Sequence, residues 1–319
     1  MGDAYLCRRG GNTLHGLVVI APPSKTSYYT GEYIDLTGMI IGADFGTFTV
    51  PISQTAYSYT PAGALTAADT TITVTADIGG RTKSVSIPIT VDSVNPDFGQ
   101  NTWETIARVA ALGQAGNYWS VGDTKVVDGV TYTIIGMNHD SLSSTDAKYA
   151  DASYNGNSKK AALTIQIMTA SGAGIMNQNN TNVGGWDNCY MRKTALPAYL
   201  SGMPSDIRSI MRTVDKITSI GGTGTTGMMT SRDKLFLLAV SEMYSSTGGW
   251  VLPDEATANP QYAYYADMPP YKNAHEWTRS PHNPNNCIDH DHFIVINSSG
   301  NLGVYVTETS AYYFPAFCI

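Results

Sequence analysis

The residues with the most evident chemistry form the run Cys287-Ile-Asp-His-Asp-His292 near the C-terminus. Thiolate, imidazole and carboxylate are the groups that bind zinc and other transition metals. On a strand, however, His290 and His292 would project from one face, and Asp289 and Asp291 from the other, so the two pairs would point apart. Because no third ligand can be identified elsewhere, we expect neither a metal nor another cofactor, and we interpret the run as polar loop surface.

The segment around this run is rich in the side chains that binding loops use. Tyr offers a large contact area at low entropic cost, and short polar residues supply hydrogen bonds. The apolar residues of Phe293 to Ile296 and Leu302 to Val306 predict two strands that keep the fold intact while polar positions stay free. We predict one exposed face whose ligand-binding residues are Asn283, Asn285, Asn286, Asp289, His290, His292, Tyr305, Thr307, Ser310, Tyr312 and Tyr313.

Three further patterns could carry chemistry, but we interpret them as structural. In Trp277-Thr-Arg-Ser-Pro281, the indole can pack in a core and the Arg279 guanidinium can hold loop carbonyls. Trp186 and Arg192 are interpreted in the same way. The Gly-rich run 219–227 lacks the Gly-Lys-Ser/Thr ending and the strand-loop-helix context of a phosphate-binding loop, so it predicts a flexible loop.

Length and composition define the elements that must position these residues. At 319 residues, with 42% hydrophobic and 14% charged residues and with 31 Gly and 20 Tyr, the chain predicts two or three β-rich modules. A net charge of -7 with 19 Lys and Arg argues against nucleic acid as a partner. The four cysteines Cys7, Cys189, Cys287 and Cys318 have no paired spacing, so we expect buried thiols.

The N-terminal stretch from Met1 to Ile20 does not have the apolar core of a signal peptide, because Gly10, Gly11, Asn12 and His15 interrupt it. No run approaches the roughly 20 apolar residues that span a bilayer. We therefore expect no Sec export, no membrane insertion, and synthesis in the cytoplasm.

Short β-rich pieces separated by turn residues run from residue 22 to residue 93. They are Tyr33 to Ile41, Thr47 to Ile52, Thr70 to Ala76 and Lys83 to Val91, with Gly79-Gly80 as a hairpin turn. The stretch Lys25-Thr-Ser-Tyr-Tyr-Thr-Gly-Glu-Tyr-Ile-Asp-Leu-Thr-Gly38 resembles the opening of bacterial Ig-like domains, which are common spacers in phage tail and surface proteins. The resemblance implies an Ig-like β-sandwich.

A change of periodicity marks the start of a second domain. Residues 94–119 predict a helical linker, with Thr102 as N-cap and Ile106, Val109 and Ala110 on one face. From residue 120 onward, Asp128-Gly129 predicts a hairpin turn. Further on, the apolar spacing of Ile207, Ile210, Met211 and Val214 predicts a helix after Ser205, and Lys234 to Val240 predicts a buried strand.

Four pieces of this second domain resemble, in order, a domain family of uncharacterised proteins in Gram-positive bacteria and their phages, which is related in pattern to C-type-lectin-like folds. They are Val121-Gly-Asp with Thr131-Tyr-Thr-Ile-Ile-Gly-Met-Asn-His-Asp140; Gly185-Trp-Asp-Asn-Cys-Tyr-Met-Arg192; Asp233-Lys-Leu-Phe-Leu-Leu with Ser241-Glu242; and Glu276-Trp-Thr-Arg-Ser-Pro281 with Phe314-Pro-Ala-Phe-Cys-Ile319. The end departs from the family, because Tyr312-Tyr-Phe314 precedes Pro315 where a Gly-Val-Arg type sequence is usual. The resemblance implies a mainly β protein with an α+β C-terminal part.

Some relatives of this kind resemble the variable proteins of diversity-generating retroelements, in which randomised Asn-type codons never yield Lys, Met, Trp, Gln or Glu. Those five types make up 39 of the 319 residues, so about four are expected in the 32 residues from His282 to Tyr313. That segment holds one of them, Glu308. The composition is consistent with a diversified surface.

These resemblances imply a phage tail-tip or tail-fibre adhesin, located in the virion, that binds a host-surface receptor, either protein or glycan, and is not an enzyme. Residues 1–21 would attach it to other tail proteins, their opening Met1 to Gly11 being similar to tail proteins of such phages; residues 22–93 would form the sandwich and residues 120–319 the receptor-binding domain. Tail adhesins of this kind are homo-oligomers, frequently trimers. The alternatives left open are a formylglycine-generating-like enzyme domain, and a purely structural tail or cell-surface protein.

Overall fold

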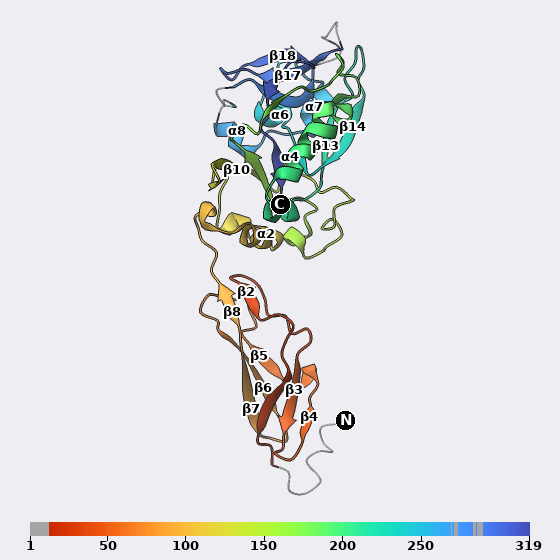
Figure 1. The fold of residues 1–319 in the computed structure, drawn as a ribbon. Coiled ribbons are helices and arrows are strands. Elements are labelled where there is room, and N and C mark those ends of the chain that lie inside the picture. Colours follow the sequence, from red (N-terminus) through yellow and green to blue (C-terminus); the bar gives the residue numbers. More distant parts are fainter. Residues whose placement is uncertain (1–12, 269, 271–273, 283–284, 286–289) are drawn as a thin grey trace. The chain divides into compact units, whose positions relative to one another are not determined.

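The computed structural model describes residues 13–268, 270, 274–282, 285 and 290–319. The chain is mainly β, with 32% strand and 20% helix, which confirms the coarse fold class predicted from the sequence. It divides into two units, Met1–Val94 and Asn95–Ile319 (Figure 1). Each unit has its own core.

Two three-stranded antiparallel sheets make up most of the N-terminal unit. The first has the order β1 (Gly16–Ala21), β3 (Ile40–Asp44), β4 (Thr49–Pro51), and the second the order β5 (Ser58–Thr60), β6 (Thr71–Asp77), β7 (Thr82–Pro88). The short strands β2 (Ser27–Tyr29) and β8 (Thr90–Asp92) pair in parallel, and η1 (Gln54–Ala56) is a single 3-10 turn.

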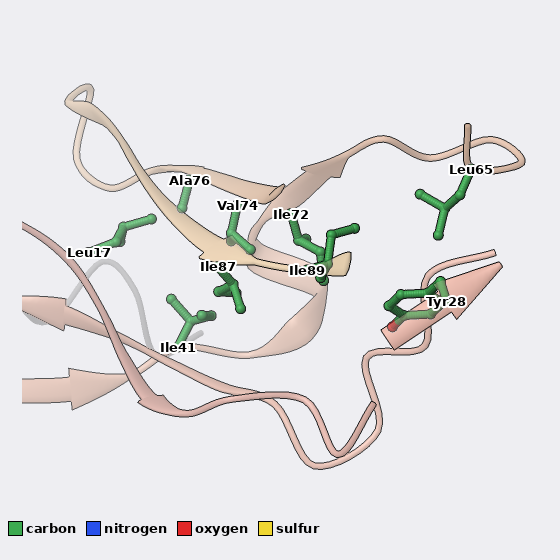
Figure 2. Packing of buried hydrophobic residues seen from close by; sticks show 9 residues of the cluster. All are labelled: Leu17, Tyr28, Ile41, Leu65, Ile72, Val74, Ala76, Ile87 and Ile89. Carbon is green, nitrogen blue, oxygen red and sulfur yellow. The ribbon is translucent and has the colours of Figure 1, made fainter. Parts of the chain in front are cut away.

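The core of this unit follows from strand alternation. In β6, Ile72, Val74 and Ala76 are buried and the intervening residues are at least partly exposed, as the Thr-rich alternation predicts. They meet Leu17, Tyr28, Ile41, Leu65, Ile87 and Ile89 in one apolar cluster (Figure 2). The β6–β7 hairpin turns through Gly79 and Gly80, both at positive φ, as predicted.

The predicted strand from Tyr33 to Ile41 is wrong over most of its length, because the strand begins only at Ile40. The Asp35 carboxylate accepts a hydrogen bond from the Thr37 amide at 2.9 Å, which is a local turn that competes with strand pairing. Gly38 then adopts a φ of 82°, outside the strand region.

The described residues of the C-terminal unit form two five-stranded sheets and one hairpin. The first sheet has the order β15 (Leu235–Phe236), β20 (Ala316–Cys318), β11 (Leu163–Ile167), β10 (Val130–Met137), β9 (Thr124–Val127). The second has the order β12 (Ala173–Gly174), β19 (Ala311–Tyr312), β16 (Glu276–Pro281), β17 (His292–Ile296), β18 (Leu302–Val306). The hairpin pairs β13 (Val214–Ser219) with β14 (Met228–Asp233).

Short helices surround these sheets. They are α2 (Trp103–Ala111), α3 (Gly185–Asn188), α4 (Leu196–Gly202), α5 (Ser205–Ile210), α6 (Val240–Met243), α7 (Pro253–Ala258) and α8 (Ala263–Asp267), with the π-helix η5 (Met191–Ala195) leading into α4. The 3-10 turns are η2 (Phe98–Gln100), η3 (Ala115–Asn117) and η4 (Tyr154–Asn157).

Helix α2 lies in the second unit, although the sequence places it in a linker. The Thr102 hydroxyl caps it by accepting a hydrogen bond from the Thr105 amide at 3.1 Å, as predicted. The Trp103 ring packs edge-on against Tyr132 and Phe317, with ring centroids 5.2 and 6.2 Å apart. The helix is therefore part of the core of this unit.

Two predictions in the middle of this unit are corrected. The helix after Ser205 ends at Ile210 rather than continuing to Val214, because Val214 begins β13 and pairs with β14. The predicted strand from Lys234 to Val240 is reduced to Leu235–Phe236, although residues 235–240 are buried as predicted. The hairpin at Asp128-Gly129 and the strands β17 and β18 are confirmed.

Within the described part of the chain, no helix has the length and apolar character needed to cross a membrane.

Candidate functional site

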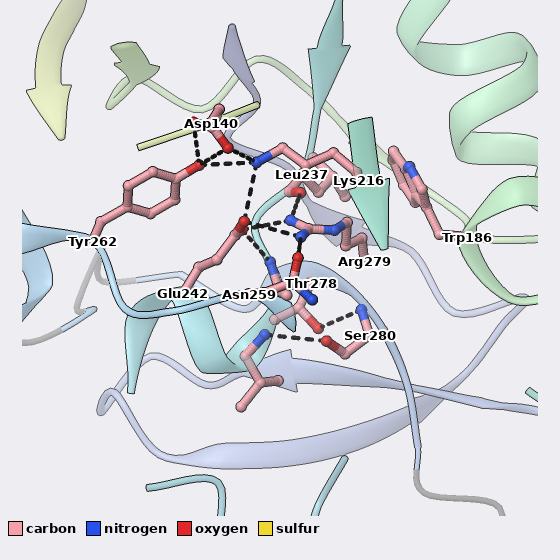
Figure 3. Close-up of polar contacts among 12 residues, drawn as sticks. Asp140, Trp186, Lys216, Leu237, Glu242, Asn259, Tyr262, Thr278, Arg279 and Ser280 are labelled. Carbon is pink, nitrogen blue, oxygen red and sulfur yellow. Dashed lines mark hydrogen bonds and ion pairs between the residues drawn. The ribbon is translucent and has the colours of Figure 1, made fainter. Parts of the chain in front are cut away.

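Four charged side chains meet in the interior of the C-terminal unit: Asp140, Lys216, Glu242 and Arg279 (Figure 3). The Lys216 ammonium bonds to the Asp140 carboxylate and lies 3.0 Å from Glu242 Oε1. Arg279 holds Glu242 with both terminal nitrogens, at 2.5 and 2.9 Å. None of these side chains is more than 4% exposed, so the charges are neutralised by one another and not by water.

We call these four side chains the ionic cluster. The ion pairs between them decide which of the four groups carry a proton. Burial alone would raise the pKa of Asp140, but the adjacent Lys216 ammonium and His139 outweigh it and hold the pKa well below its usual value. Burial would also raise the pKa of Glu242, but the nearby charges of Arg279 and Lys216 outweigh burial and lower the pKa. All four groups are therefore charged in the folded protein.

Arg279 also fixes the backbone around it. Its Nη1 donates to the Leu237 carbonyl at 2.9 Å, and its amide donates to the Leu238 carbonyl at 2.9 Å. Its Nη2 donates to Asn259 Oδ1 at 2.6 Å. The predicted role of this guanidinium, holding loop carbonyls, is confirmed, and it ties β16 to the segment before α6.

The second predicted structural pair is also confirmed. Trp186 Nε1 donates to Asp233 Oδ2 at 3.0 Å, and Arg192 Nε donates to Asp233 Oδ1 at 2.7 Å. Trp277 donates its indole N–H to the Gly174 carbonyl at 2.8 Å. These contacts hold α3 and η5 against β14, and β12 against β16. The Gly-rich run 219–227 connects β13 to β14 as a hairpin loop.

The interior anchors the C-terminal segment from both flanks. All residues of β16 and all residues from Phe314 to Ile319 are buried. Between them, Phe293 to Ile296 are buried in β17. The buried Asn182 holds the start of β17: its amide donates to the His290 carbonyl at 2.6 Å and its Nδ2 to the His292 carbonyl at 2.9 Å.

The structure divides the predicted binding residues by exposure. Exposed are Asn285, His290, Ser310 and Tyr312, which we call the exposed set. Half-buried are His292, Tyr305 and Tyr313, and Thr307 is fully buried. Asn283, Asn286 and Asp289 lie outside the described residues.

Thr307 is corrected from a surface position to an interior one. Its hydroxyl donates to the Asn179 carbonyl at 3.0 Å, and its amide donates to the Asp291 carbonyl at 2.8 Å. Its own carbonyl accepts from the Met176 and Asn177 amides. With these bonds made inside the chain, Thr307 holds the end of β18 beside residue 291.

Two of the predicted tyrosines meet at His275. The Tyr305 ring stacks on the His275 ring at 5.4 Å, and its hydroxyl lies 2.7 Å from His275 Nδ1. The Tyr312 amide donates to the His275 carbonyl at 2.9 Å. Tyr312 itself is 47% exposed. Tyr313 instead packs over Gly172, where a Cβ would come within 2.5 Å of its hydroxyl. Tyr312 is thus the exposed aromatic residue of this group.

The run from Cys287 to His292, which we interpret as polar loop surface, is described only from His290 onward. His290 precedes β17, and His292 begins that strand with its Nδ1 2.5 Å from Asp291 Oδ1. Cys287 and Asp289 lie outside the described residues. Across the residues that the structure does describe, no three His, Cys, Asp or Glu side chains are grouped as metal ligands would be. Cys189 and Cys318 are buried thiols, as expected, and burial raises the pKa of Cys189 to about 12.

Sequence reasoning missed Lys216 and Asn182. Lys216 follows Val214 by two residues and points to the same buried face of β13. That alternation could have placed it in the core, but the segment had been predicted to continue a helix. Asn182 precedes two glycines at positive φ and gives no comparable signal.

These features define a class: a mainly β protein with two units, whose C-terminal unit carries a polar surface segment on a buried, ion-paired frame. The chain belongs to the family described as "Domain of unknown function (DUF6273)", whose model matches residues 159–319. Lys216, Glu242 and Arg279 lie within the matched part, whereas Asp140 precedes it. The chain has no match among the curated proteins.

Proposed function

We propose that the protein is a receptor-binding protein of a phage tail, which attaches to a host-surface ligand through its C-terminal segment. In this proposal, the N-terminal unit is an Ig-like spacer and the C-terminal unit a C-type-lectin-like domain. Two three-stranded sheets around one core support the first part. The segment 1–21 would join other tail proteins, and copies of the chain would assemble as an oligomer, which raises weak single-site affinity by avidity.

The proposal rests on one observation: within residues 282–313, some of the described residues are buried in the fold and others are exposed at the surface. Buried residues such as Ile294 and Thr307 fix this segment in the fold. The residues of the exposed set lie at the surface, so their side chains can change with little effect on core packing. A surface of this kind suits recognition, because specificity can vary while the frame stays constant.

The ionic cluster supports the choice of binding over catalysis. Each of its carboxylates is already paired with a cation, and each pair lies in the interior. Such a group stabilises a fold or specifies its geometry. It has no free base or nucleophile to offer to a substrate.

The test is attachment of the labelled full-length chain to a panel of Gram-positive cells. Replacing Asn285, His290, Ser310 and Tyr312 together by Ala should reduce cell binding at least tenfold, because a good aromatic anchor alone contributes about 1–3 kcal/mol. The melting temperature should stay within about 2 °C of wild type. A matched control is Tyr33→Ala, which removes a tyrosine that is 65% exposed in the other unit. Unchanged attachment by the fourfold variant would refute the proposal.

A further inference from the structure

A cavity of about 640 Å³ lies outside the exposed set, between the loop that follows α6 and the helix α7. Its volume is in the range of small-molecule sites. Hydroxyl side chains dominate its wall: Ser241, Tyr244, Ser245, Ser246, Thr247 and Thr257. None of the described residues that line it carries a charge.

Ser241 supplies an independent sign that something binds there. It is 5% exposed, and its hydroxyl has no hydrogen-bond partner among the described residues. Leaving a buried hydroxyl unpaired is unfavourable, so folded proteins normally satisfy such groups. Because Ser241 also lines the cavity, a ligand hydroxyl there could become its partner once the serine side chain turned toward it.

The loop over the cavity is held in place before any ligand arrives. Tyr244 donates its hydroxyl to the Gly300 carbonyl at 2.6 Å, which ties the loop to the β17–β18 turn. The Trp250 amide donates to the Thr247 carbonyl at 2.9 Å, and the Trp250 ring contacts His282. Gly248 and Gly249 have φ values of 55° and 82°, which turn the chain sharply between them. A pre-ordered loop lowers the entropic cost of binding.

We propose that this cavity is a binding site for a neutral carbohydrate. Serine and threonine hydroxyls both donate and accept hydrogen bonds, as sugar hydroxyls do. Val251, Pro253 and Ala256 provide apolar contacts for the C–H faces of a sugar ring. An anionic ligand would be desolvated here without a counter-charge, which disfavours it. The site is separate from the exposed set and goes beyond the proposed function by naming a second contact and its chemistry.

The full-length chain is titrated calorimetrically with maltotriose, mannotriose, triacetylchitotriose and lactose. At least one should bind with a Kd on the order of 1 mM or tighter. Ser241→Ala combined with Thr247→Ala should weaken that binding at least tenfold. Ser246→Trp, which fills the cavity from an exposed position and leaves the core intact, should do the same. The matched control Ser209→Ala, exposed on α5, should bind as wild type does.

Binding of none of the four sugars at about 10 mM would overturn the inference, as would equal binding by the cavity variants and the wild type. The fourfold Ala variant of the exposed set separates the two proposals. It should lose cell attachment and keep sugar binding. If it loses sugar binding as well, the sugar occupies the exposed set and the cavity assignment is wrong.

Discussion

Lys216 and Arg279 stabilise two carboxylates that could not otherwise remain charged in the interior. Attraction between buried charges offsets desolvation only when every member has its partner. Glu242 is central, because it pairs with both cations. Losing its charge therefore affects the whole cluster.

Glu242→Gln should lower the free energy of unfolding by about 3–5 kcal/mol, since it leaves Arg279 buried without its carboxylate. Urea denaturation measures the loss. The matched control is Glu104→Gln, at an exposed position of α2, which should change stability by less than about 0.5 kcal/mol. Equal effects of the two substitutions would show that the cluster contributes no specific stability.

Glu255 behaves differently from the paired carboxylates. Burial raises its pKa to about 7, although the Ser219 amide donates to its Oε2 at 2.8 Å. The folded state then binds this proton more tightly than the unfolded state, whose Glu titrates near 4.5. The contribution to stability is fully present below about pH 4.5 and is lost as the pH rises through 7, in total about 3 kcal/mol.

Glu255→Gln should remove this decline, so the difference in unfolding free energy between variant and wild type should grow from pH 5 to pH 8. Burial lowers the pKa of His282, so this residue contributes to the pH dependence with the opposite sign. Its contribution is the same in both proteins and cancels when they are compared. Denaturation at a series of pH values gives both curves. Parallel curves would show that Glu255 does not titrate in this range.

The elements that could be predicted are those specified locally. The Asp128-Gly129 turn, the Thr102 cap and the alternation of β6 each depend on neighbouring residues, and each is observed. Elements set by distant contacts could not be predicted. The strand after Lys234 is short because the Leu237 carbonyl accepts from the Arg279 guanidinium and the Leu238 carbonyl from the Arg279 amide, rather than from β20, which pairs with Leu235 and Phe236.

The candidate site follows the same rule. The apolar run of β17 predicts its buried residues. The burial of Thr307 instead depends on hydrogen bonds that it accepts from the amides of residues 176 and 177 and donates to the carbonyl of residue 179, far away in the sequence. Lys216 is a different case: the alternation of β13 marks it as buried, whereas its three partners come from other segments and give no signal near it in the sequence.

Strand β20 is expected to contribute strongly to the stability of the C-terminal unit. It lies between β15 and β11, so the last residues of the chain are interior to a sheet. Phe317→Ala should lower the free energy of unfolding by about 3–5 kcal/mol, because the Phe317 ring is fully buried. Phe48→Ala, at a ring that is 39% exposed, is the matched control and should cost less. If the two variants lost comparable free energy of unfolding in urea, β20 would not contribute more to stability than an exposed position does.

The two units have separate cores, so we expect them to unfold separately. Calorimetry of the full-length chain should show two transitions. Ile72→Ala should lower only one of them, and Glu242→Gln only the other. A single transition shifted by both substitutions would mean that the units fold as one cooperative body.

Receptor binding through the exposed set is the central claim, and competition tests it most directly. If the chain is the tail protein that we propose, the purified chain should block adsorption of its phage, because both would occupy the same host ligand. Tyr33→Ala should block as well as wild type, whereas the fourfold Ala variant of Asn285, His290, Ser310 and Tyr312 should fail at the same concentration. Full blocking by that variant would contradict the account, because the receptor would then be bound by other residues.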